Sequence, residues 1–156
     1  MKILMVCLGN ICRSPMAHGI MRNKSEMLGL DIEVDSAGTS AYHVGDPPDS
    51  RQQATAAQKL IEIGDLRARQ FITKDYDEFD IIYAMDQSNY DNILSLARTE
   101  KDAKKVKMIL NESTPGKHLS VPDPYYGGDS GFELVYNLLD DACSVIAKKI
   151  QDGTYR

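Results

Sequence analysis

Residues 7–15 read CLGNICRSP, and this stretch decides how the start of the chain folds. The residues just before it, 3–6, form an apolar run of the type that makes a buried strand. The residues after it can begin a helix, because Pro15 is tolerated at a first helical position and Ser14 is a good cap. The sequence therefore predicts a strand, a tight loop and a helix over residues 15–28, with the Cys7 thiol at the tip of the strand.

Strand-like and helix-like segments continue to alternate along the rest of the chain. Three more strands are predicted at DIEVDSAGTS (31–40), FDIIYAM (79–85) and VKMIL (106–110). Three more helices are predicted from a cap at Asp49 or Ser50 to Gly64, after Asp86 as far as Ala97, and over residues 130–150. Apolar strands joined by helices favour an α/β fold of three layers with a four-stranded parallel sheet. Right-handed crossovers give the strand order 2-1-3-4, which places a ligand site beside the end of the first strand.

The composition narrows the class of protein. A chain of 156 residues is most simply one domain, and 42% hydrophobic with 26% charged residues is ordinary for a globular protein. A net charge of −5 argues against general nucleic-acid binding, which uses a basic face. The apolar stretches are too short for a membrane span, and the start of the chain does not resemble a signal peptide. Three cysteines in no paired set favour a reducing, cytoplasmic compartment, and neither they nor the three histidines have the spacing of a zinc site.

The loop after the first strand has the composition of an anion-binding site. Successive backbone N–H groups leading into a helix N-terminus cradle anions, and Arg13 adds a planar fork for two oxygens. Thiols at helix N-termini ionise readily, so we expect Cys7 to be a thiolate at neutral pH. Such a thiolate suits attack on phosphorus through a cysteinyl-phosphate intermediate, with Ser14 donating a hydrogen bond to the sulfur. Asn10 and Gly9 suit the backbone shape of this loop.

A second motif, PDPYYGG (122–128), supplies a candidate acid. Asp-Pro alone is typical of a turn, but expelling an aryl leaving group needs a proton donor, and Asp123 beside tyrosines can provide one. Cys7 alone would be interpreted as a packed strand residue, and its combination with Arg13, Ser14 and Asp123 favours catalysis. The remaining cysteine and histidines are interpreted as core (Cys143) and as surface or capping residues (His18, His43 and His118).

Taken together, these motifs resemble those of the low-molecular-weight protein tyrosine phosphatases. Cys-x5-Arg-Ser also occurs in unrelated phosphatases, but here DSAGTS, GDPPD, AMDQSN and DPYYGG follow in order, so the resemblance runs essentially end to end. It implies a flavodoxin-like sheet, one phosphatase domain over residues 1–156, no metal and no cofactor. The implied substrates are phosphotyrosine proteins and small aryl phosphates. Exposed aromatics at the cleft could support weak self-association of a monomer.

The resemblance also implies roles for individual residues. Cys7 is the nucleophile, Arg13 the phosphate clamp and Asp123 the general acid. The phosphate cradle and the cleft walls comprise Leu8, Gly9, Asn10, Ile11, Cys12, Arg13, Ser14, Tyr42 and Tyr125. The supporting residues are Ser36, which pairs with Asn10 to prop the loop, Asp86, which orients Arg13, and Tyr126, next to the wall. Leu66 stands where many relatives have a histidine.

Several alternatives stay open. Cys12 is either a core residue or, as in the family, a thiol that closes a disulfide with Cys7 under oxidant. Tyr125 and Tyr126 are either cleft wall or phosphorylated sites. A thiol-dependent arsenate reductase of the same fold would need a relay of cysteines, of which only Cys143 is distant from the loop. A non-catalytic phosphate-binding module would not need nucleophile, clamp and acid together.

Overall fold

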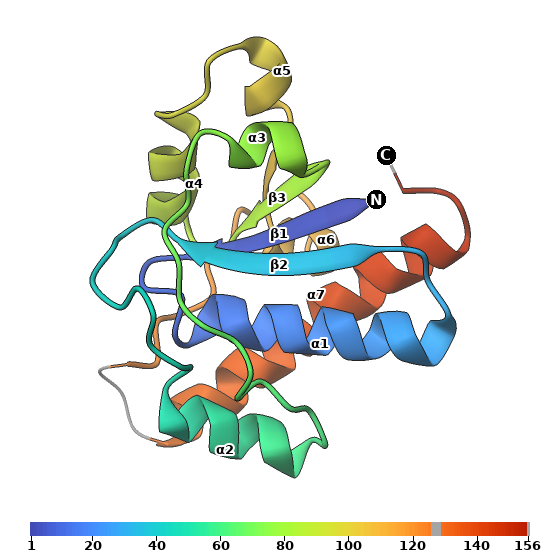
Figure 1. The fold of residues 1–156 in the computed structure, drawn as a ribbon. Coiled ribbons are helices and arrows are strands. Elements are labelled where there is room, and N and C mark those ends of the chain that lie inside the picture. The colour runs from blue at the N-terminus through green and yellow to red at the C-terminus, as the bar shows by residue number, and fades with distance from the viewer. Residues whose placement is uncertain (126–128, 156) are drawn as a thin grey trace.

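A four-stranded parallel sheet forms the centre of the molecule, with helices on both of its faces (Figure 1). The computed structural model describes residues 1–125 and 129–155. The strands are β1 (Lys2–Cys7), β2 (Glu33–Gly38), β3 (Ile81–Ala84) and β4 (Val106–Met108). They pair in the order β2-β1-β3-β4, with every pairing parallel. The predicted α/β fold and strand order are therefore confirmed.

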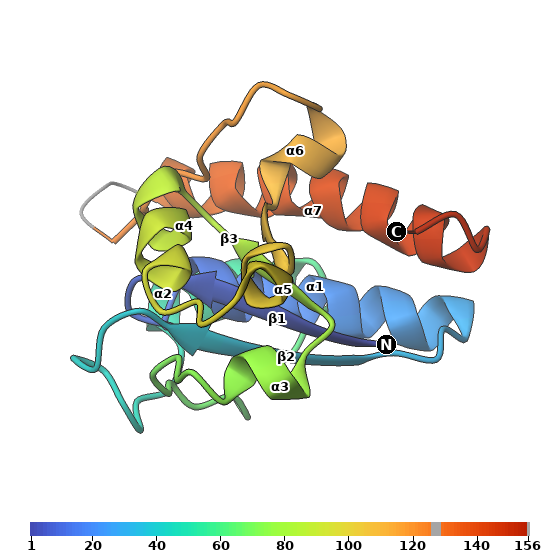
Figure 2. The same cartoon turned by 90° about the horizontal axis from the view of Figure 1, so that it is seen from above.

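The helices form two layers around the sheet (Figures 1 and 2). One layer contains α1 (Arg13–Leu28), α2 (Ser50–Gln58), α6 (Leu110–Ser113) and α7 (Asp129–Gln151). The other contains α3 (Asp75–Glu78), α4 (Gln87–Leu94) and α5 (Glu100–Ala103). Within the described residues, no helix combines the length and the apolar character that crossing a bilayer requires.

Successive side chains of strand β1 point to opposite faces of the sheet, and a core lies on each face, so β1 is buried on both. Ile3 and Met5 join the larger core, which α1 and α7 cover. Leu4 and Val6 join the second core, on the side of α3 and α4. Cys7 shares the face of Ile3 and Met5, so its sulfur is directed toward the start of α1.

Some predicted helix bounds were wrong, and the second helix shows why. α2 ends at Gln58 instead of continuing to Gly64. Leu60 has a φ of 61° and is 91% exposed, so the chain leaves the helix there. Ile63 then returns to the core and packs against Gly19 of α1. The contact is so close that a Cβ added to Gly19 would lie 2.4 Å from Cγ2 of Ile63. Elsewhere α1 begins two residues earlier than expected, α4 ends at Leu94, and the one-turn helices α3, α5 and α6 were not predicted.

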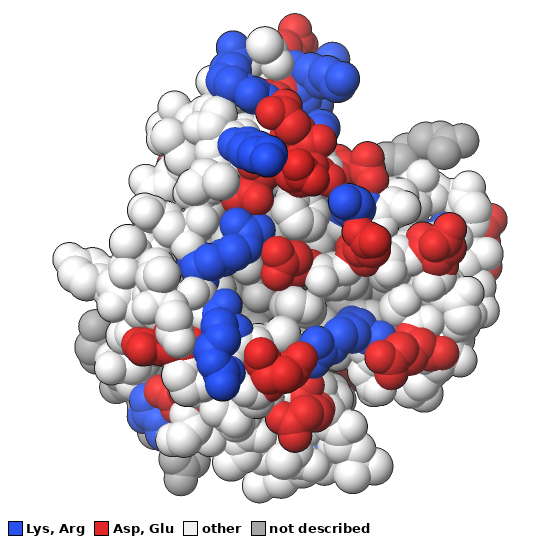
Figure 3. Space-filling model, viewed as in Figure 1, with Lys and Arg blue, Asp and Glu red and all other residues white. Residues whose placement is uncertain are grey.

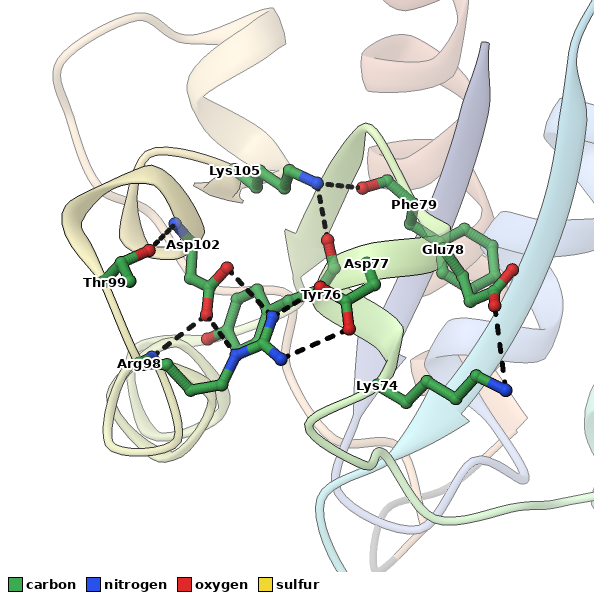
Figure 4. A network of polar contacts seen from close by, with 9 residues as sticks. All are labelled: Lys74, Tyr76, Asp77, Glu78, Phe79, Arg98, Thr99, Asp102 and Lys105. Carbon is green, nitrogen blue, oxygen red and sulfur yellow. Dashed lines mark hydrogen bonds and ion pairs between the residues drawn. The ribbon is translucent and has the colours of Figure 1, made fainter.

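A polar network ties α3 to α5 on the side of the sheet away from α1 (Figure 4). Arg98 donates to the carboxylates of Asp77 and Asp102. Lys105 donates to the backbone carbonyl oxygens of Tyr76 and Phe79. Arg98 and Asp77 are both largely exposed, so we expect their ion pair to contribute little to the stability of the fold. The pair between Arg98 and the buried Asp102 should contribute more to that stability.

Candidate active site

The loop of residues 8–12, here called the cradle loop, connects the end of β1 to the start of α1. Asn10 has a left-handed φ of 58°, and its backbone N–H donates to Cys7 Sγ over 3.3 Å. Ser14 Oγ lies 3.0 Å from the same sulfur and accepts a hydrogen bond from Asn10 Nδ2 at 2.7 Å. Because Ser14 already accepts from Asn10, its own proton is available for the sulfur. The Asn10 backbone N–H and the Ser14 hydroxyl thus both lie within hydrogen-bond distance of Cys7 Sγ.

The expected pairing of Asn10 with Ser36 is wrong in its partners. Asn10 Oδ1 accepts from the backbone N–H of Arg69 at 3.1 Å, while its amide nitrogen bonds to Ser14. Ser36 Oγ instead lies 3.0 Å from His18 Nδ1. Asn10 therefore props the loop by bridging α1 and the segment before α3, and Ser36 takes no direct part in that bridge.

His18 was predicted to lie at the surface or to cap a helix, and it does neither. Its imidazole is buried between α1 and β2, and burial, with Arg22 nearby, lowers its pKa to about 4. His18 is therefore neutral near pH 7. His118 is exposed and its Nδ1 lies 3.2 Å from Asn111, while His43 lines the cleft.

Arg13 is 3% exposed and is held by two elements distant in sequence. Its Nη1 donates to Asp86 Oδ2 at 2.6 Å and to the carbonyl oxygen of Val121 at 3.0 Å. Asp86 is itself fixed as the N-cap of α4. Burial opposes the charge, but Cys7 and the hydrogen bond to Asp86 outweigh it, so the pKa of Arg13 lies above its usual value. The orienting contact expected of Asp86 is thus present.

Asp123 stands at the rim of the site, with its side chain 35% exposed. Its Oδ2 lies 3.7 Å from Arg13 Nη2, and its Oδ1 accepts from the backbone N–H of Tyr125 at 3.0 Å. At the start of the same loop, the backbone N–H of Val121 donates to the carbonyl oxygen of Met85 at 2.8 Å. A carboxyl group is thereby presented above the guanidinium.

A cleft of about 490 Å³ opens over the cradle loop and brings together most of the predicted site residues, although Asn10, Ser14, Ser36 and Asp86 are not part of its lining. Its lining contains Cys7, Leu8, Gly9, Ile11, Cys12, Arg13, Tyr42, Asp123 and Tyr125, together with Ser40 and His43, which the sequence did not single out. His43 packs so closely on the loop that a Cβ on Gly9 would lie 3.0 Å from its ring. Tyr42 is 90% exposed at the rim. Tyr126 lies outside the described residues, and Leu66 packs against the larger core.

A larger hollow of about 660 Å³ lies along β2, on the face shown in Figure 3, where basic and acidic side chains are interspersed. Arg69 there bonds to Asp35 and Asp75, and Lys2 lies 3.3 Å from Glu33. The charges named are satisfied by one another, and the lining contains no cysteine. The chemistry of the molecule therefore centres on the smaller cleft.

The two other cysteines are buried and differ from Cys7 in surroundings. Burial first, and then the charge of Asp49, raise the pKa of Cys12 well above its ordinary value. Cys143 is fully buried in α7, and burial raises its pKa to about 12. All three thiols are free. A relay that passes a disulfide outward from Cys7 has no exposed partner among them.

Comparison with known proteins agrees with this geometry. A family model described as low molecular weight phosphotyrosine protein phosphatase matches residues 2–154. A Synechocystis protein provisionally named a low molecular weight protein-tyrosine-phosphatase is 50% identical over 145 residues, 92% of each chain. Among solved structures, a protein tyrosine phosphatase from Entamoeba histolytica has a TM-score of 0.92 and 38% identity over 99% of both chains. A Drosophila arginine phosphatase has a TM-score of 0.88 and 31% identity, covering 95% of this chain and 96% of that one. The chain belongs to the low-molecular-weight phosphotyrosine protein phosphatase family.

Proposed function

We propose that Cys7, Arg13 and Asp123 carry out the phosphatase reaction of this chain, with phosphotyrosine in proteins as the substrate. The observation that carries the proposal is their convergence in one cleft. Cys7 Sγ receives two hydrogen-bond donors, and the Arg13 guanidinium lies 3.7 Å from the Asp123 carboxylate. A nucleophile, an anion clamp and a proton donor are the three groups that phosphoryl transfer from an aryl ester needs.

In the first step, the phosphate group binds to the N–H groups of the cradle loop and to Arg13. The Cys7 thiolate attacks phosphorus, so that an S–P bond forms as the bond from phosphorus to the phenolic oxygen breaks. Asp123 gives its proton to that oxygen, and the phenol leaves neutral. In the second step, Asp123 takes a proton from water, whose oxygen attacks phosphorus. The S–P bond breaks and phosphate is released.

The walls of the cleft favour a flat aromatic ester. Tyr42 and Tyr125 border the cleft, and the His43 and Tyr125 ring centroids lie 6.2 Å apart. A planar ring can stack on such surfaces while its phosphate reaches the cradle. Two relatives by structure are described as arginine phosphatases, so phosphoarginine is the competing substrate that the assay includes.

We also propose that residues 1–156 act as a single domain and as a monomer capable of weak self-association. The span of the family match, residues 2–154, supports the single domain. The exposed Tyr42 at the cleft supports the weak self-association. Three free cysteines support a reducing compartment such as the cytoplasm.

The test measures phosphate release in the presence of a chelator from tyrosyl, arginyl and p-nitrophenyl phosphate. We expect hydrolysis of the two aryl esters and a loss of at least about a thousandfold in Cys7→Ser, which still binds inorganic phosphate. Cys143→Ala, which removes a buried thiol outside the cleft lining, serves as the control and stays active. Substantial activity in Cys7→Ser would refute the nucleophile. Cleavage of arginyl phosphate faster than that of tyrosyl phosphate would refute phosphotyrosine as the substrate. Arsenate-dependent thiol consumption would favour the arsenate reductase.

A further inference from the structure

The segment that carries Asp123 is held by an arginine on each side. Arg13 Nη1 donates to the carbonyl oxygen of Val121 at 3.0 Å, and Arg51 Nη2 donates to the carbonyl oxygen of Tyr125 at 3.1 Å. Asp123 lies midway, two residues from each anchored carbonyl. The first arginine belongs to the phosphate site, whereas the second comes from α2 and has no role in the mechanism described above.

Arg51 is well fixed for a surface arginine. Its Nε and Nη2 donate to the two carboxylate oxygens of Asp49 at 3.1 and 3.0 Å, a two-point contact that sets the plane of the guanidinium. Asp49 also caps α2 by accepting from the Arg51 backbone N–H. On its other side, the backbone N–H of Asp49 donates to the carbonyl oxygen of Ile11 in the cradle loop at 2.8 Å. A short path of contacts thus joins the cradle loop to the end of the Asp123 segment.

Aromatic rings complete the seat of the guanidinium. Its central carbon lies 4.7 Å from the ring centre of Phe132, in the first part of α7, and 5.7 Å from that of Tyr125. Stacking on aromatic faces is a property of arginine that lysine reproduces poorly. Arg51 therefore contacts three regions at once: the cap of α2, the start of α7 and the Asp123 segment.

We infer that Arg51 is a positioning residue that holds the Asp123 carboxyl group where it can protonate the leaving oxygen. The link is the hydrogen bond from the Tyr125 backbone N–H to Asp123 Oδ1, which couples the carboxylate to the backbone at Tyr125. When the Tyr125 carbonyl is fixed by Arg51, the carboxylate is fixed with it. Proton transfer needs hydrogen-bond reach, so a small displacement of the acid costs much of its effect.

This role predicts a selective effect on catalysis. The inference rests on the proposed acid role of Asp123, since Arg51 acts only through that group. A phenol of ordinary acidity needs the proton as it leaves, whereas p-nitrophenol departs readily as its anion. Loss of Arg51 should therefore slow tyrosyl phosphate cleavage more than p-nitrophenyl phosphate cleavage. A general loosening of the fold would slow both equally.

The experiment compares single-turnover cleavage of both esters by the wild type, Arg51→Ala, Arg51→Lys, Asp123→Asn and the double variant Arg51→Ala/Asp123→Asn. Arg22→Ala is the matched control, because Arg22 also forks onto a carboxylate, Asp65, and donates to a backbone carbonyl, that of Glu62. Its contacts lie outside the cleft lining. Melting temperatures and the affinity for inorganic phosphate are measured for every variant.

We expect Arg51→Ala to lower the tyrosyl rate about tenfold more than the p-nitrophenyl rate, with Arg51→Lys intermediate. In the Asp123→Asn background, removing Arg51 should leave the ratio of the two rates unchanged. Arg22→Ala should keep the wild-type ratio. Equal slowing of both esters by Arg51→Ala, or a further change of ratio in the double variant, would overturn the inference alone. An unchanged ratio in Asp123→Asn would overturn the acid assignment and the inference with it.

Discussion

His18 Nδ1 and Ser36 Oγ lie 3.0 Å apart, one helical turn along α1 from the contact between Ser14 and Ala37 of β2. Ser14 precedes His18 by one helical turn, and its Oγ lies 3.4 Å from the carbonyl oxygen of Ala37, the residue after Ser36. Two successive turns of α1 therefore contact two successive residues of β2. This pair of contacts fixes the height of α1 against the sheet, and hence the position of the helix start below the cleft.

Stability should depend on pH through His18. Its folded pKa of about 4 lies below the ordinary value of 6.5, so between these pH values the unfolded chain binds a proton that the folded chain does not. The free energy of unfolding should therefore fall as pH drops from about 6.5 to 4, by up to about 3 kcal/mol from this group. Urea unfolding of the wild type and His18→Gln at several pH values measures the difference. Parallel pH profiles for the two proteins would show that His18 makes no such contribution.

Gly38 is required by the close approach of β2 to the cradle loop. A Cβ at this position would lie 2.7 Å from the carbonyl oxygen of Leu8 and 3.1 Å from the backbone nitrogen of Asn10. Because both are backbone atoms, Gly38→Ala should displace the loop, weaken phosphate binding at least about tenfold and cost about 1–3 kcal/mol of stability. Gly29→Ala is the contrast, since Gly29 has a φ of 63° with open space around it. Gly29→Ala should lose stability and keep the wild-type affinity for phosphate. If Gly29→Ala and Gly38→Ala bound phosphate with similar affinity, the steric argument would be contradicted.

Asp123→Asn should reveal the acid through the leaving group. Tyrosine's phenol has a pKa of about 10, so its departure at neutral pH depends on a proton donor. We expect the variant to cleave tyrosyl phosphate about a hundredfold more slowly in a single turnover, with a much smaller loss for p-nitrophenyl phosphate. The alkaline limb of the pH–rate profile should also flatten. If both esters slow equally and the limb persists, Asp123 only shapes the loop.

Peroxide should inactivate the enzyme reversibly through the two thiols of the cradle region. Cys12 is held as a thiol by its raised pKa, so Cys7 should be oxidised first, to a sulfenic acid. Attack by Cys12 then forms an S–S bond with loss of water, which blocks further oxidation. We expect Cys12→Ser to recover less activity than the wild type after treatment with a thiol reductant. Peptide mapping should find the Cys7–Cys12 link in the oxidised wild type; equal recovery without that link would leave Cys12 a packing residue.

The sheet could be predicted because its information is local. Each strand is a short apolar run, and right-handed crossovers leave few possible orders. The end of α2 could not, because it is set by Leu60 leaving the helix and Ile63 returning to Gly19, a contact between distant segments. His18 was misplaced for a related reason. Residues 13–21 are all buried, so the first half of α1 has no polar face for a histidine to occupy.

The candidate site likewise has a part that could be predicted from the local sequence and a part that could not. The groups around the sulfur could be predicted because they lie within residues 7–14. Asp123 came from a separate motif, PDPYYGG, and only Asp86 came from the resemblance to a family alone. Arg51 was missed because its importance depends on how two loops meet. The only local signal was Asp49, two residues before Arg51, at a position already predicted as a helix cap. An aspartate at that spacing can form a two-point contact with the arginine side chain.

The central position of β1 has a consequence for the order of synthesis. Translation produces β1 and the cradle loop before β3, the neighbour that β1 needs, and α1 packs against α7, which is synthesised after all four strands. The reactive thiol therefore waits in an incomplete nascent chain until almost every other element has been synthesised. Contacts so distant in sequence also slow refolding. During both periods Cys7 lacks its cleft, and renaturation from denaturant should give a higher yield of active enzyme when reductant is present throughout.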